Sequence, residues 1–569
     1  MKILLTAVNA KYIHSNPAVY SLKAYAQSFP AVQKAEHKIL IAEYTINQQI
    51  DDILRGIYRQ APDMLCFSCY IWNISCIENI VREIHKVLPK TVIWLGGPEV
   101  SYDAEAVLKR LPEASGVMRG EGEETFARLA AGEAVERVLG ITYRNKEGAI
   151  CENPWRGVME LDKVPFIYQN MTDFVNRIVY YESSRGCPFH CSYCLSSLDK
   201  KLRFRNLELV KQDLLFFINH EVPLVKFVDR TFNCNHRHAM VIWQYIMEQD
   251  RGITNFHFEI AADLLNEEEL RLISRMRPGL IQLEIGVQSV NLETVREIHR
   301  TMQFEKVSAN VRRIREKGNV HQHLDLIAGL PYEDFDSFHR SFNAVYDLRP
   351  EQLQLGFLKV LKGSFMDEHK KSYGLVCQSR PPYEVLYTRW LSYEDILLLK
   401  GVEEMVEIYY NSGQFVKTLP VLEEGLPDAF TLYLRLAEYY ENRKLRLISH
   451  TRAARYEILL AFAEETVPER AEEIRELLIY DYYLKENAKS RPVFAGEYRM
   501  DKKELREFYE KECREHRYLP GYERYDKNQM RKMTHLEYFK KIGETVLFDY
   551  SRRNPLNRQA RTVIIAKTK

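Results

Sequence analysis

Three cysteines stand within eight positions of this 569-residue sequence, at Cys187, Cys191 and Cys194. They lie in the segment RGCPFHCSYC, where Gly186 and Pro188 indicate a turn directly after a predicted strand. Thiolates are soft ligands that favour iron–sulfur clusters or zinc. The spacing C-x3-C-x2-C therefore predicts a metal centre that these three thiolates bind.

Two kinds of metal centre fit this loop. An iron–sulfur cluster accepts three thiolates on one of its faces. A closed structural zinc site needs a fourth ligand, for which His190 and His220 are available. Three buried structural cysteines do not fit, because the segment is too polar and too rich in turn-forming residues for a core strand.

The elements that must position this loop alternate in type from Ile178 onward. Apolar runs that predict strands are separated by segments that predict helices, such as NEEELRLISRM from Asn266. The predicted strands begin at Ile178, Leu224, Asn255, Leu280, His321 and Gln352. Six such units predict a partial β/α barrel over residues 177–365, with its functional face at the carboxyl ends of the strands.

The N-terminal region shows a similar alternation. Its apolar runs begin at Lys2, His37, Asp63, Thr91 and Ser115. Continuous apolar strands between helices are typical of a parallel sheet that is covered on both faces. We therefore expect an α/β chain that starts with a doubly wound, Rossmann-like domain at residues 1–137, whose ligand crevice lies at the carboxyl ends of the strands. Residues 138–176 are expected to form a hairpin and a linker.

The cysteine motif, with Tyr193 just before the last cysteine and at the mouth of a β/α barrel, resembles the signature of the radical S-adenosylmethionine (SAM) enzymes. In that family three cysteines hold a 4Fe–4S cluster, and SAM binds the fourth iron. Reduction of SAM there yields methionine and a 5'-deoxyadenosyl radical, which abstracts hydrogen from a substrate. The resemblance implies that Cys187, Cys191 and Cys194 are the metal ligands and that an electron donor such as flavodoxin or ferredoxin is a partner.

The same resemblance implies a set of SAM-binding positions. The segment GVQS on the fourth barrel strand is similar to the family's ribose-binding strand, and Arg300 stands where the oxygen-independent coproporphyrinogen dehydrogenases place an arginine for the SAM carboxylate. The segment FVDRTFN departs from the family's Gly-Gly-Glu-like turn, so Asp229 or backbone carbonyls would hold the SAM amino group. The implied positions are Tyr193, Asp229, Glu259, Gln288, Ser289, Arg300 and Asp325.

The N-terminal domain resembles the cobalamin-binding domain of one large branch of the radical SAM family. The resemblance rests on FSCYIW, which contains Ser68, on a glycine pair after the fourth strand, and on RGEGEETF after the fifth. Glycine there admits the nucleotide tail of cobalamin close to the strand ends. The implied cobalamin positions are Ser68, Gly96, Gly97, Gly120 and Glu121.

Two features of this domain have other interpretations. The cobalt-ligating motif D-x-H-x-x-G is absent, and we interpret His14 in NAKYIHSNP as a surface or capping residue. Cys66, Cys69 and Cys76 are the ligands of a second iron–sulfur cluster in one hypothesis, by resemblance to the tRNA methylthiotransferases. In the other they are small buried hydrophobic residues, which general burial statistics favour.

The rest of the chain predicts no further motif. Strands are expected to stop after about Gly363, and residues 366–569 are expected to form a mostly helical accessory domain that ends in a basic tail from Ser551. The net charge is +1, with 80 Lys and Arg against 79 Asp and Glu, so nucleic acid is not a favoured partner. The absence of a membrane-length apolar run, of a secretory signal and of a disulfide pattern predicts a cytoplasmic protein with no membrane partner.

These observations predict a cobalamin-dependent radical SAM enzyme, which cleaves SAM reductively for C-methylation of a small molecule or a peptide. One alternative is a tRNA-modifying, methylthiotransferase-like enzyme that uses the basic tail. A second is a cobalamin-dependent radical rearrangement or cyclisation without methyl transfer. A third is a cobalamin or redox sensor without catalysis. No catalytic residue is assigned, although Cys234 and Cys377 are candidates for quenching a radical.

Overall fold

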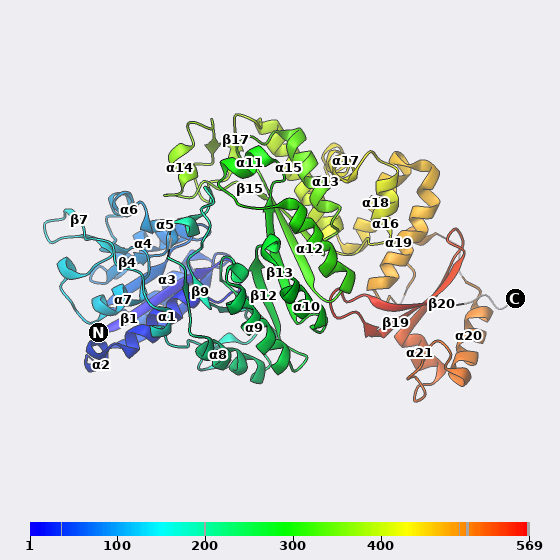
Figure 1. Ribbon diagram of the computed structural model, residues 1–569, viewed down its shortest axis with the longest axis horizontal. Helices are drawn as coiled ribbons and strands as arrows, with labels where there is room; N and C mark the ends of the chain where they lie inside the picture. The colour runs from blue at the N-terminus through cyan, green and yellow to red at the C-terminus, as the bar shows by residue number, and fades with distance from the viewer. Residues whose placement is uncertain (36, 199–200, 489, 497–499, 566–569) are drawn as a thin grey trace. The chain divides into compact units, whose positions relative to one another are not determined.

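The structure is a computed structural model that describes residues 1–35, 37–198, 201–488, 490–496 and 500–565. The chain divides into two compact units. The first unit holds residues 1–317, 327–334 and 357–393, and the second holds residues 318–326, 335–356 and 394–569. Figure 1 labels the helices and strands of both units.

A seven-stranded sheet forms the N-terminal part of the first unit. Its strands are β1 (Lys2–Asn9), β2 (Lys38–Thr45), β3 (Met64–Ser68), β4 (Val92–Gly96), β5 (Gly116–Met118), β6 (Ile141–Arg144) and β7 (Ile150–Glu152). They follow the order β2-β1-β3-β4-β5-β6-β7, and the first five are parallel. The predicted doubly wound sheet is confirmed, and its strand order changes direction between β1 and β3, where such folds bind ligands.

The hairpin of β6 and β7 belongs to this sheet. β6 pairs antiparallel with β5, and β7 pairs antiparallel with β6. The hairpin thereby covers the backbone N–H and C=O groups of β5 that would otherwise form an open sheet edge. The sheet is therefore complete only at Glu152, beyond the expected domain end at residue 137.

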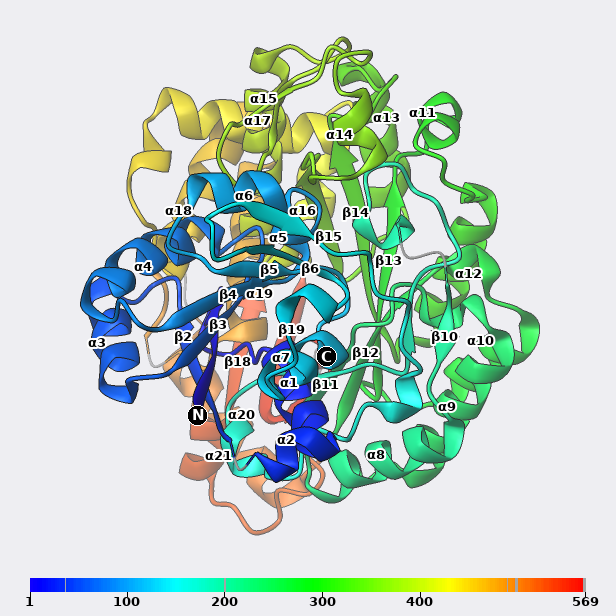
Figure 2. The ribbon, with the colours of Figure 1, turned by 90° about the vertical axis from the view of Figure 1, so that its left-hand side faces the viewer.

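Helices cover both faces of the sheet. α1 (Pro17–Ser28) and α7 (Glu123–Ala130) pack on one face, while α3 (Ile50–Gln60), α4 (Ile74–Val87) and α6 (Ala104–Arg110) pack on the other (Figure 2). α4 shows why the sequence folds this way, because its buried residues are four isoleucines and Val81, which recur at helical spacing. Each buried aliphatic side chain contributes about 1.5–3 kcal/mol. The helices thus hold the strand ends in a fixed row.

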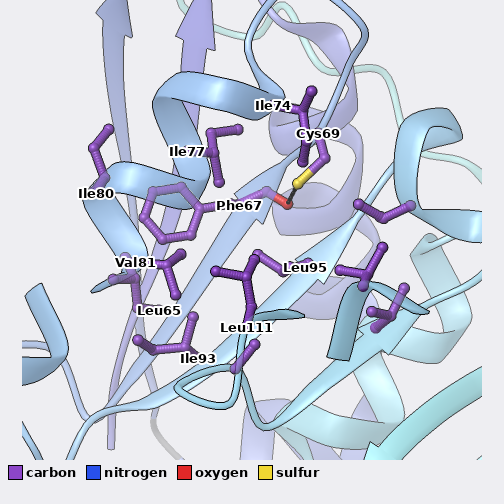
Figure 3. Close-up of a cluster of buried hydrophobic side chains, with 14 of the residues drawn as sticks. Leu65, Phe67, Cys69, Ile74, Ile77, Ile80, Val81, Ile93, Leu95 and Leu111 are labelled. Atoms are coloured by element: carbon purple, nitrogen blue, oxygen red, sulfur yellow. Dashed lines mark hydrogen bonds between the residues drawn. The ribbon is translucent and has the colours of Figure 1, made fainter. Parts of the chain in front are cut away.

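Cys66 and Cys69 are core residues of opposite faces of the sheet. Cys66 packs with the cluster under α1 and α7, whereas Cys69 packs with the cluster under α3 and α4. Figure 3 shows Cys69 among Phe67, Ile74 and Ile77, with its sulfur 3.7 Å from the Phe67 carbonyl oxygen. Side chains on opposite faces cannot bind one cluster, so the structure contradicts the hypothesis of a second iron–sulfur site and supports buried hydrophobic roles.

The second sheet has six strands in the order β15-β14-β13-β12-β11-β8. These are β8 (Val179–Tyr181), β11 (Leu224–Phe227), β12 (Asn255–Ile260), β13 (Ile281–Gln288), β14 (His321–Ala328) and β15 (Gln352–Phe357). The four strands of this sheet that lie in the first unit, β8, β11, β12 and β13, pair in parallel. The helices of this part are α8 (Leu207–Asn219), α9 (His236–Gln249), α10 (Glu267–Arg275), α11 (Leu292–Glu297), α12 (Phe304–Lys317) and α13 (Phe335–Tyr346). The predicted partial β/α barrel is confirmed.

The N-terminal sheet and the strands β8 to β13 lie in the same compact unit. Ile178 N, just before β8, donates a hydrogen bond to Ile13 O over 2.7 Å. Arg185, just after β8, forms an ion pair with the buried Glu123 at 2.9 Å. The N-terminal sheet and the barrel strands of this unit therefore share a contact surface.

The second unit is mostly helical, as expected, but it also contains strands. Its helices include α15 (Tyr393–Met405), α16 (Thr418–Glu424), α17 (Ala429–Asn442), α18 (Arg452–Thr466), α19 (Ala471–Lys485), α20 (Lys502–Glu515) and α21 (Lys527–Met533). An antiparallel sheet follows, made of β18 (Thr534–Phe539), β19 (Glu544–Arg553) and β20 (Ala560–Ile565). Among the residues described, no helix has both the length and the apolar character needed to cross a membrane.

The basic segment from Ser551 is part of this small sheet. Ser551 lies in β19, and Ala560 to Ile565 form β20, which pairs with β19. The basic segment up to Ile565 therefore belongs to the fold, because alternating apolar side chains such as Val563 pack on the core of the sheet. Residues 566–569 lie outside the described part of the chain.

Candidate functional site at the strand ends of the first unit

The cysteine loop is closed at its base by two short strands. β9 (Ser184–Arg185) pairs antiparallel with β10 (Arg203–Phe204), one on either side of the loop. Gly186 has φ +92°, and a Cβ there would lie 2.7 Å from Lys201 O. Only glycine fits this crossing of the two chain segments, so the residue before the first cysteine is set by the closure of the loop.

Backbone hydrogen bonds fix the middle of the loop. Ser192 N donates to Ile298 O over 3.0 Å, and Met366 N donates to Ser192 O over 3.0 Å. The three loop cysteines are free thiols, and Cys191 is buried. The loop is thus held between the end of α11 and the start of α14 (Phe365–His369).

The zinc alternative lacks its fourth ligand. His190 is exposed on the loop itself. His220 caps the carboxyl end of α8 just before β11 begins, and β11 is parallel to β8. His220 therefore lies at the opposite edge of the sheet from the cysteine loop. Within the described ranges, no three His, Cys, Asp or Glu side chains lie close enough to hold a single metal ion.

Arg300 lies beside the cysteine loop. Its Nη1 is 3.8 Å from Cys191 Sγ and 3.5 Å from Tyr193 Oη, and its Nη2 donates to Gly286 O. Burial, opposed by the charge of Arg300, raises the pKa of Tyr193 well above its usual range. Two of the predicted SAM positions and a predicted cluster ligand are thus brought together, although they come from segments more than 100 positions apart.

Gln288 completes this group. It ends β13 with φ +72°, and its side chain turns back over Gly286, where a Cβ would overlap its Nε2. Gln288 Oε1 and Arg300 Nε are buried, and neither has a hydrogen-bond partner among the residues that the structure describes. Buried polar atoms rarely stay unpaired in folded proteins. A polar ligand beside the cysteine loop would satisfy both atoms.

Two other predicted SAM positions are engaged in the fold. Ser289 is fully buried, and its hydroxyl donates to Glu333 Oε1 over 2.6 Å. Asp229 is also fully buried and accepts hydrogen bonds from the hydroxyls of Ser183 and Ser184, each over 2.6 Å. Burial raises the pKa of Asp229 to about 6. These contacts favour structural roles, and for the SAM amino group they favour the backbone carbonyls over Asp229.

The carboxylates of the third and fifth barrel strands belong to different compact units. Glu259 is in β12 of the first unit, where it pairs in register with Glu284. Glu284 binds Lys226 at 3.0 Å and His257 at 2.9 Å, and these partners, opposing the effect of burial, lower its pKa to about 2. Asp325 is in β14 of the second unit, with His323 Nε2 at 3.1 Å.

A cavity of about 720 Å³ opens at the carboxyl ends of β3, β4 and β5. Its wall contains all of the predicted cobalamin positions, namely Ser68, Gly96, Gly97, Gly120 and Glu121. The opposite wall comes from the connector of residues 155–168 and from the end of β8. The cavity therefore lies between the N-terminal sheet and the barrel strands of the first unit.

The glycine pair contributes to this cavity in two different ways. Gly97 has φ +116°, and a Cβ there would lie 3.0 Å from Cys69 N and closer still to its carbonyl oxygen. The fold itself thus demands glycine at position 97. At Gly96 a Cβ would only make ordinary contact with Met118 at 3.6 Å. Because packing accepts a side chain at Gly96, its absence there keeps space open in the cavity.

The other predicted cobalamin positions have defined partners. Gly120 N donates a hydrogen bond to Ser101 Oγ over 3.2 Å. Glu121 binds Arg203 at 2.5 Å and accepts a hydrogen bond from Met159 N over 2.7 Å. Glu121 therefore joins the N-terminal sheet to the base of the cysteine loop.

Trp155 is a cavity residue that the sequence reasoning missed. Its ring lines the cavity, is 49% exposed, and lies 4.6 Å from the guanidinium carbon of Arg119. In the sequence, the feature that could have indicated this residue is a single tryptophan in a polar connector. Aromatic rings at cavity walls supply apolar contact area for ligands, so Trp155 joins the candidate site.

A salt-bridge group holds α5 (Pro98–Ser101), the short helix directly after the glycine pair. Lys362 Nζ lies 3.0 Å from both Glu99 Oε1 and Asp103 Oδ2. Tyr383 Oη donates to Glu99 Oε1 over 2.6 Å. Glu99 is only 5% exposed, so its charge depends on these partners. The segment after the barrel thus fixes one wall of the cavity.

A second cavity of about 560 Å³ adjoins the first, and Tyr70, Tyr180 and Arg185 line both. The loop after β1, the loop after β3 and the start of the cysteine loop form its wall. His14 is in this wall, with its Nδ1 2.6 Å from Tyr180 Oη. His14 is half-buried, and its ring is held between the N-terminal sheet and β8, so its interpretation as a surface or capping residue stays a prediction.

Comparison with known proteins identifies the two parts that surround these cavities. Residues 4–130 match the B12 binding domain, and residues 181–345 match the radical SAM superfamily. The chain combines a B12-binding domain with a radical SAM domain. The radical SAM match includes the cysteine loop, and the B12-binding match includes the strand ends of the first cavity. Residues 371–564 match a third family, described as a protein of unknown function (DUF4080).

Two curated relatives show the range of similar proteins. The 2-(S-pantetheinyl)-carbapenam-3-carboxylate methyltransferase of Streptantibioticus cattleyicolor is 24% identical over 357 residues, which are 57% of this chain and 50% of that protein. The anaerobic magnesium-protoporphyrin IX monomethyl ester cyclase of Rubrivivax gelatinosus is 22% identical over 338 residues, which are 55% of this chain and 59% of that protein. The chain thus spans about half the length of these curated relatives.

A solved structure shares the fold. The cobalamin-dependent S-adenosylmethionine radical enzyme OxsB, with aqua-cobalamin and S-adenosylmethionine bound, aligns with a TM-score of 0.59 at 15% identity. The alignment covers 84% of this chain and 78% of that one. The similarity extends beyond the two matched domains, and it confirms the fold class predicted from the sequence.

Proposed function

We propose that this protein is a cobalamin-dependent radical SAM enzyme that methylates a carbon atom of a small molecule or a peptide. The observation that carries the proposal is the position of the two candidate sites in one compact unit. The cysteine loop and the cavity of the B12-binding domain are joined through the ion pair of Glu121 and Arg203. Two cofactors held this close can act on one substrate.

The residues beside the cysteine loop fit a 4Fe–4S cluster with SAM. Three free thiols on one closed loop leave one iron without a protein ligand. A reduced cluster of this kind supplies the electron that cleaves SAM. Gln288 Oε1 and Arg300 Nε are the unpaired polar atoms that SAM would satisfy, while Tyr193 orients Arg300.

The first cavity fits cobalamin. Gly96 leaves its wall open, Ser68 lies 8% exposed at the end of β3, and Trp155 offers an apolar face. Cobalamin supplies a cobalt-bound methyl group when it is loaded. The contribution of the chain is to hold this group beside the barrel mouth and to exclude bulk water from the space between them.

The test is an anaerobic reaction of the reconstituted protein with SAM and a chemical reductant. We expect 5'-deoxyadenosine from reductive cleavage and S-adenosylhomocysteine from remethylation of the cofactor. Cys194→Ala should abolish the first product, whereas Cys151→Ala, at a cysteine of the N-terminal sheet, should leave it unchanged. Absence of both products from the wild-type protein would contradict the proposal.

A radical rearrangement or cyclisation without methyl transfer is the second candidate, because one relative is named as a cyclase. It predicts 5'-deoxyadenosine without S-adenosylhomocysteine in the same reaction. The tRNA-modifying alternative loses both of its supports, since Cys66 and Cys69 lie on opposite faces and the basic segment is paired in a sheet.

The remaining parts of the proposal concern partners and location. An electron donor such as flavodoxin or ferredoxin would reduce the cluster. The oxygen sensitivity of such a cluster and the ten free cysteines fit a reducing, cytoplasmic location. We also propose domain limits at residues 137, 176 and 365.

A further inference from the structure

The second cavity touches both candidate cofactor sites. Gly186 and Ser196, which flank the three loop cysteines in the sequence, line it. Tyr70 and Tyr180 line it as well, and both also line the first cavity, where we propose that cobalamin binds. A molecule in this space therefore lies beside both cofactors. The volume of about 560 Å³ is that of a pocket for a small molecule.

Arg230 carries a charge in this wall that no partner compensates. It lies in the loop after β11, it is exposed, and its guanidinium forms neither an ion pair nor a hydrogen bond with any residue of the described ranges. Glu182, the acid among the described lining residues, binds Arg185 through two hydrogen bonds over 2.9 and 2.8 Å. Burial and the charges of two nearby lysines lower the pKa of His14, so that its ring is neutral at pH 7. Among the lining residues that the structure describes, Arg230 alone therefore offers a free charge.

The local backbone holds Arg230 in place. Asp229, directly before it, is fully buried, and its carboxylate accepts hydrogen bonds from the hydroxyls of Ser183 and Ser184. That carboxylate is therefore engaged by hydroxyls and not by the neighbouring guanidinium. A guanidinium offers its N–H groups in a planar fork that matches the oxygens of a carboxylate or a phosphate. The wall of the cavity is thus equipped to bind an organic anion.

An aromatic pair forms another part of the wall. Trp72 is 46% exposed, and its ring stacks on that of Tyr70 with 4.3 Å between the ring centroids and an angle of 11° between the planes. The fully buried Asn73 fixes the loop that carries both rings, because it accepts a hydrogen bond from Tyr70 N and donates to the carbonyl oxygens of Val8 and Ser68. A ring held in this way offers flat apolar area at little cost in conformational entropy. The pair therefore suits a ligand with a flat apolar part.

We infer that the second cavity binds the substrate, and that this substrate is an organic anion whose carboxylate or phosphate pairs with Arg230 while its flat apolar part packs against Trp72. The inference rests on the proposed function and describes the substrate of that same site. Arg230 and Trp72 then determine specificity, the first for charge and the second for shape. They come from two different parts of the unit, the loop after β11 and the loop after β3.

The decisive measurement is anaerobic titration calorimetry of the full-length protein reconstituted with its cluster, cobalamin and SAM. The probes are naphthoate, naphthyl phosphate and the uncharged naphthamide, which share one flat ring system. We expect at least one of the two anions to bind about tenfold more tightly than the amide, because hydrogen bonds to a charged group are the stronger ones. The anion that binds more tightly identifies the group that Arg230 recognises. Equal affinity for the three probes, or no binding of either anion, would overturn the inference.

Variants assign the binding to the two residues. Arg230→Gln should remove the preference for the anion and leave the affinity for naphthamide unchanged, whereas Trp72→Ala should weaken the binding of all three probes by a similar factor. Arg237→Gln, at an exposed arginine of α9 outside both cavities, is the matched control and should bind the probes as the wild-type protein does. If Arg230→Gln keeps the preference for the anion, the inference is wrong.

Two further readouts separate the substrate from the cofactors. Arg230→Gln should retain cobalamin and bind SAM as the wild-type protein does. Loss of either would assign Arg230 to a cofactor and overturn the inference. Failure of the proposed function has a different signature, namely the absence of both 5'-deoxyadenosine and S-adenosylhomocysteine from the wild-type reaction, whichever probes bind.

Discussion

Substitution of the two cavity glycines by alanine should separate a folding requirement from a binding requirement. At Gly97 the backbone has φ +116° and ψ 171°, a region that is essentially restricted to glycine, and a Cβ would collide with the backbone of Cys69. The strain alone is on the order of 1–3 kcal/mol. At Gly96 the added Cβ meets Met118 at 3.6 Å, which is ordinary contact and costs no folding free energy.

The assay compares thermal unfolding of the cobalamin-free proteins with cobalamin retention after removal of excess cofactor. With about 2 kcal/mol lost and roughly 2 °C per kcal/mol, Gly97→Ala should unfold ~4 °C below the wild-type protein. Gly96→Ala should unfold at the wild-type temperature and retain less cobalamin, because the methyl group occupies the cavity wall. Equal unfolding temperatures for the wild-type and Gly97→Ala proteins would refute the reasoning from backbone conformation. Full retention by Gly96→Ala would refute the assignment of that space to the cofactor.

Three further predictions concern neighbouring contacts. Arg300→Lys should weaken SAM binding to the reconstituted protein by about tenfold without loss of iron, because lysine lacks the planar fork; unchanged binding by equilibrium dialysis would contradict this. Lys362→Met should cost about 2 kcal/mol in urea unfolding, since Glu99 stays buried with its charge, whereas Lys370→Met, at an exposed pair, should cost under about 1 kcal/mol. Burial lowers the pKa of His238 to about 4. Below about pH 6.5 this histidine therefore binds a proton in the unfolded chain but not in the folded chain. The free energy of unfolding should therefore fall by about 1.4 kcal/mol by about pH 5.5, and His238→Gln should remove this decrease. An equal decrease in the variant would exclude the histidine as its source.

The sequence predicts the elements of the first unit well because their signals are local. Continuous apolar runs such as that of β1 are typical of strands buried on both faces, and the helical spacing of apolar residues in α4 recurs over three turns. The cysteine loop is also local, since its ligands and its turn residue lie within one short segment. Gln288 and Arg300 both lie near Gly286 because they flank α11, which is a short element.

The remaining contacts depend on residues that are distant in sequence. The resemblance predicts Asp229 near SAM, but its carboxylate accepts hydrogen bonds from Ser183 and Ser184, which stand 46 and 45 positions earlier in the chain. His14 was expected at the surface because its partner lies in another part of the unit. The sheet of β18 to β20 had a local signal in its alternating apolar residues, which the high content of tyrosine and arginine obscured. Patterns of residue type do not record such pairings.

The contact of Glu99 with Lys362 and Tyr383 has a consequence for how the protein is made. The ribosome synthesises α5 early, but the partners of Glu99 arrive 263 and 284 residues later. Until then α5, in one wall of the first cavity, lacks the ion pair and the hydrogen bond that hold it. At about 5–20 residues per second, this delay amounts to tens of seconds at the slow end. The wall that α5 forms is therefore held in place only once the segment with Lys362 and Tyr383 has been made.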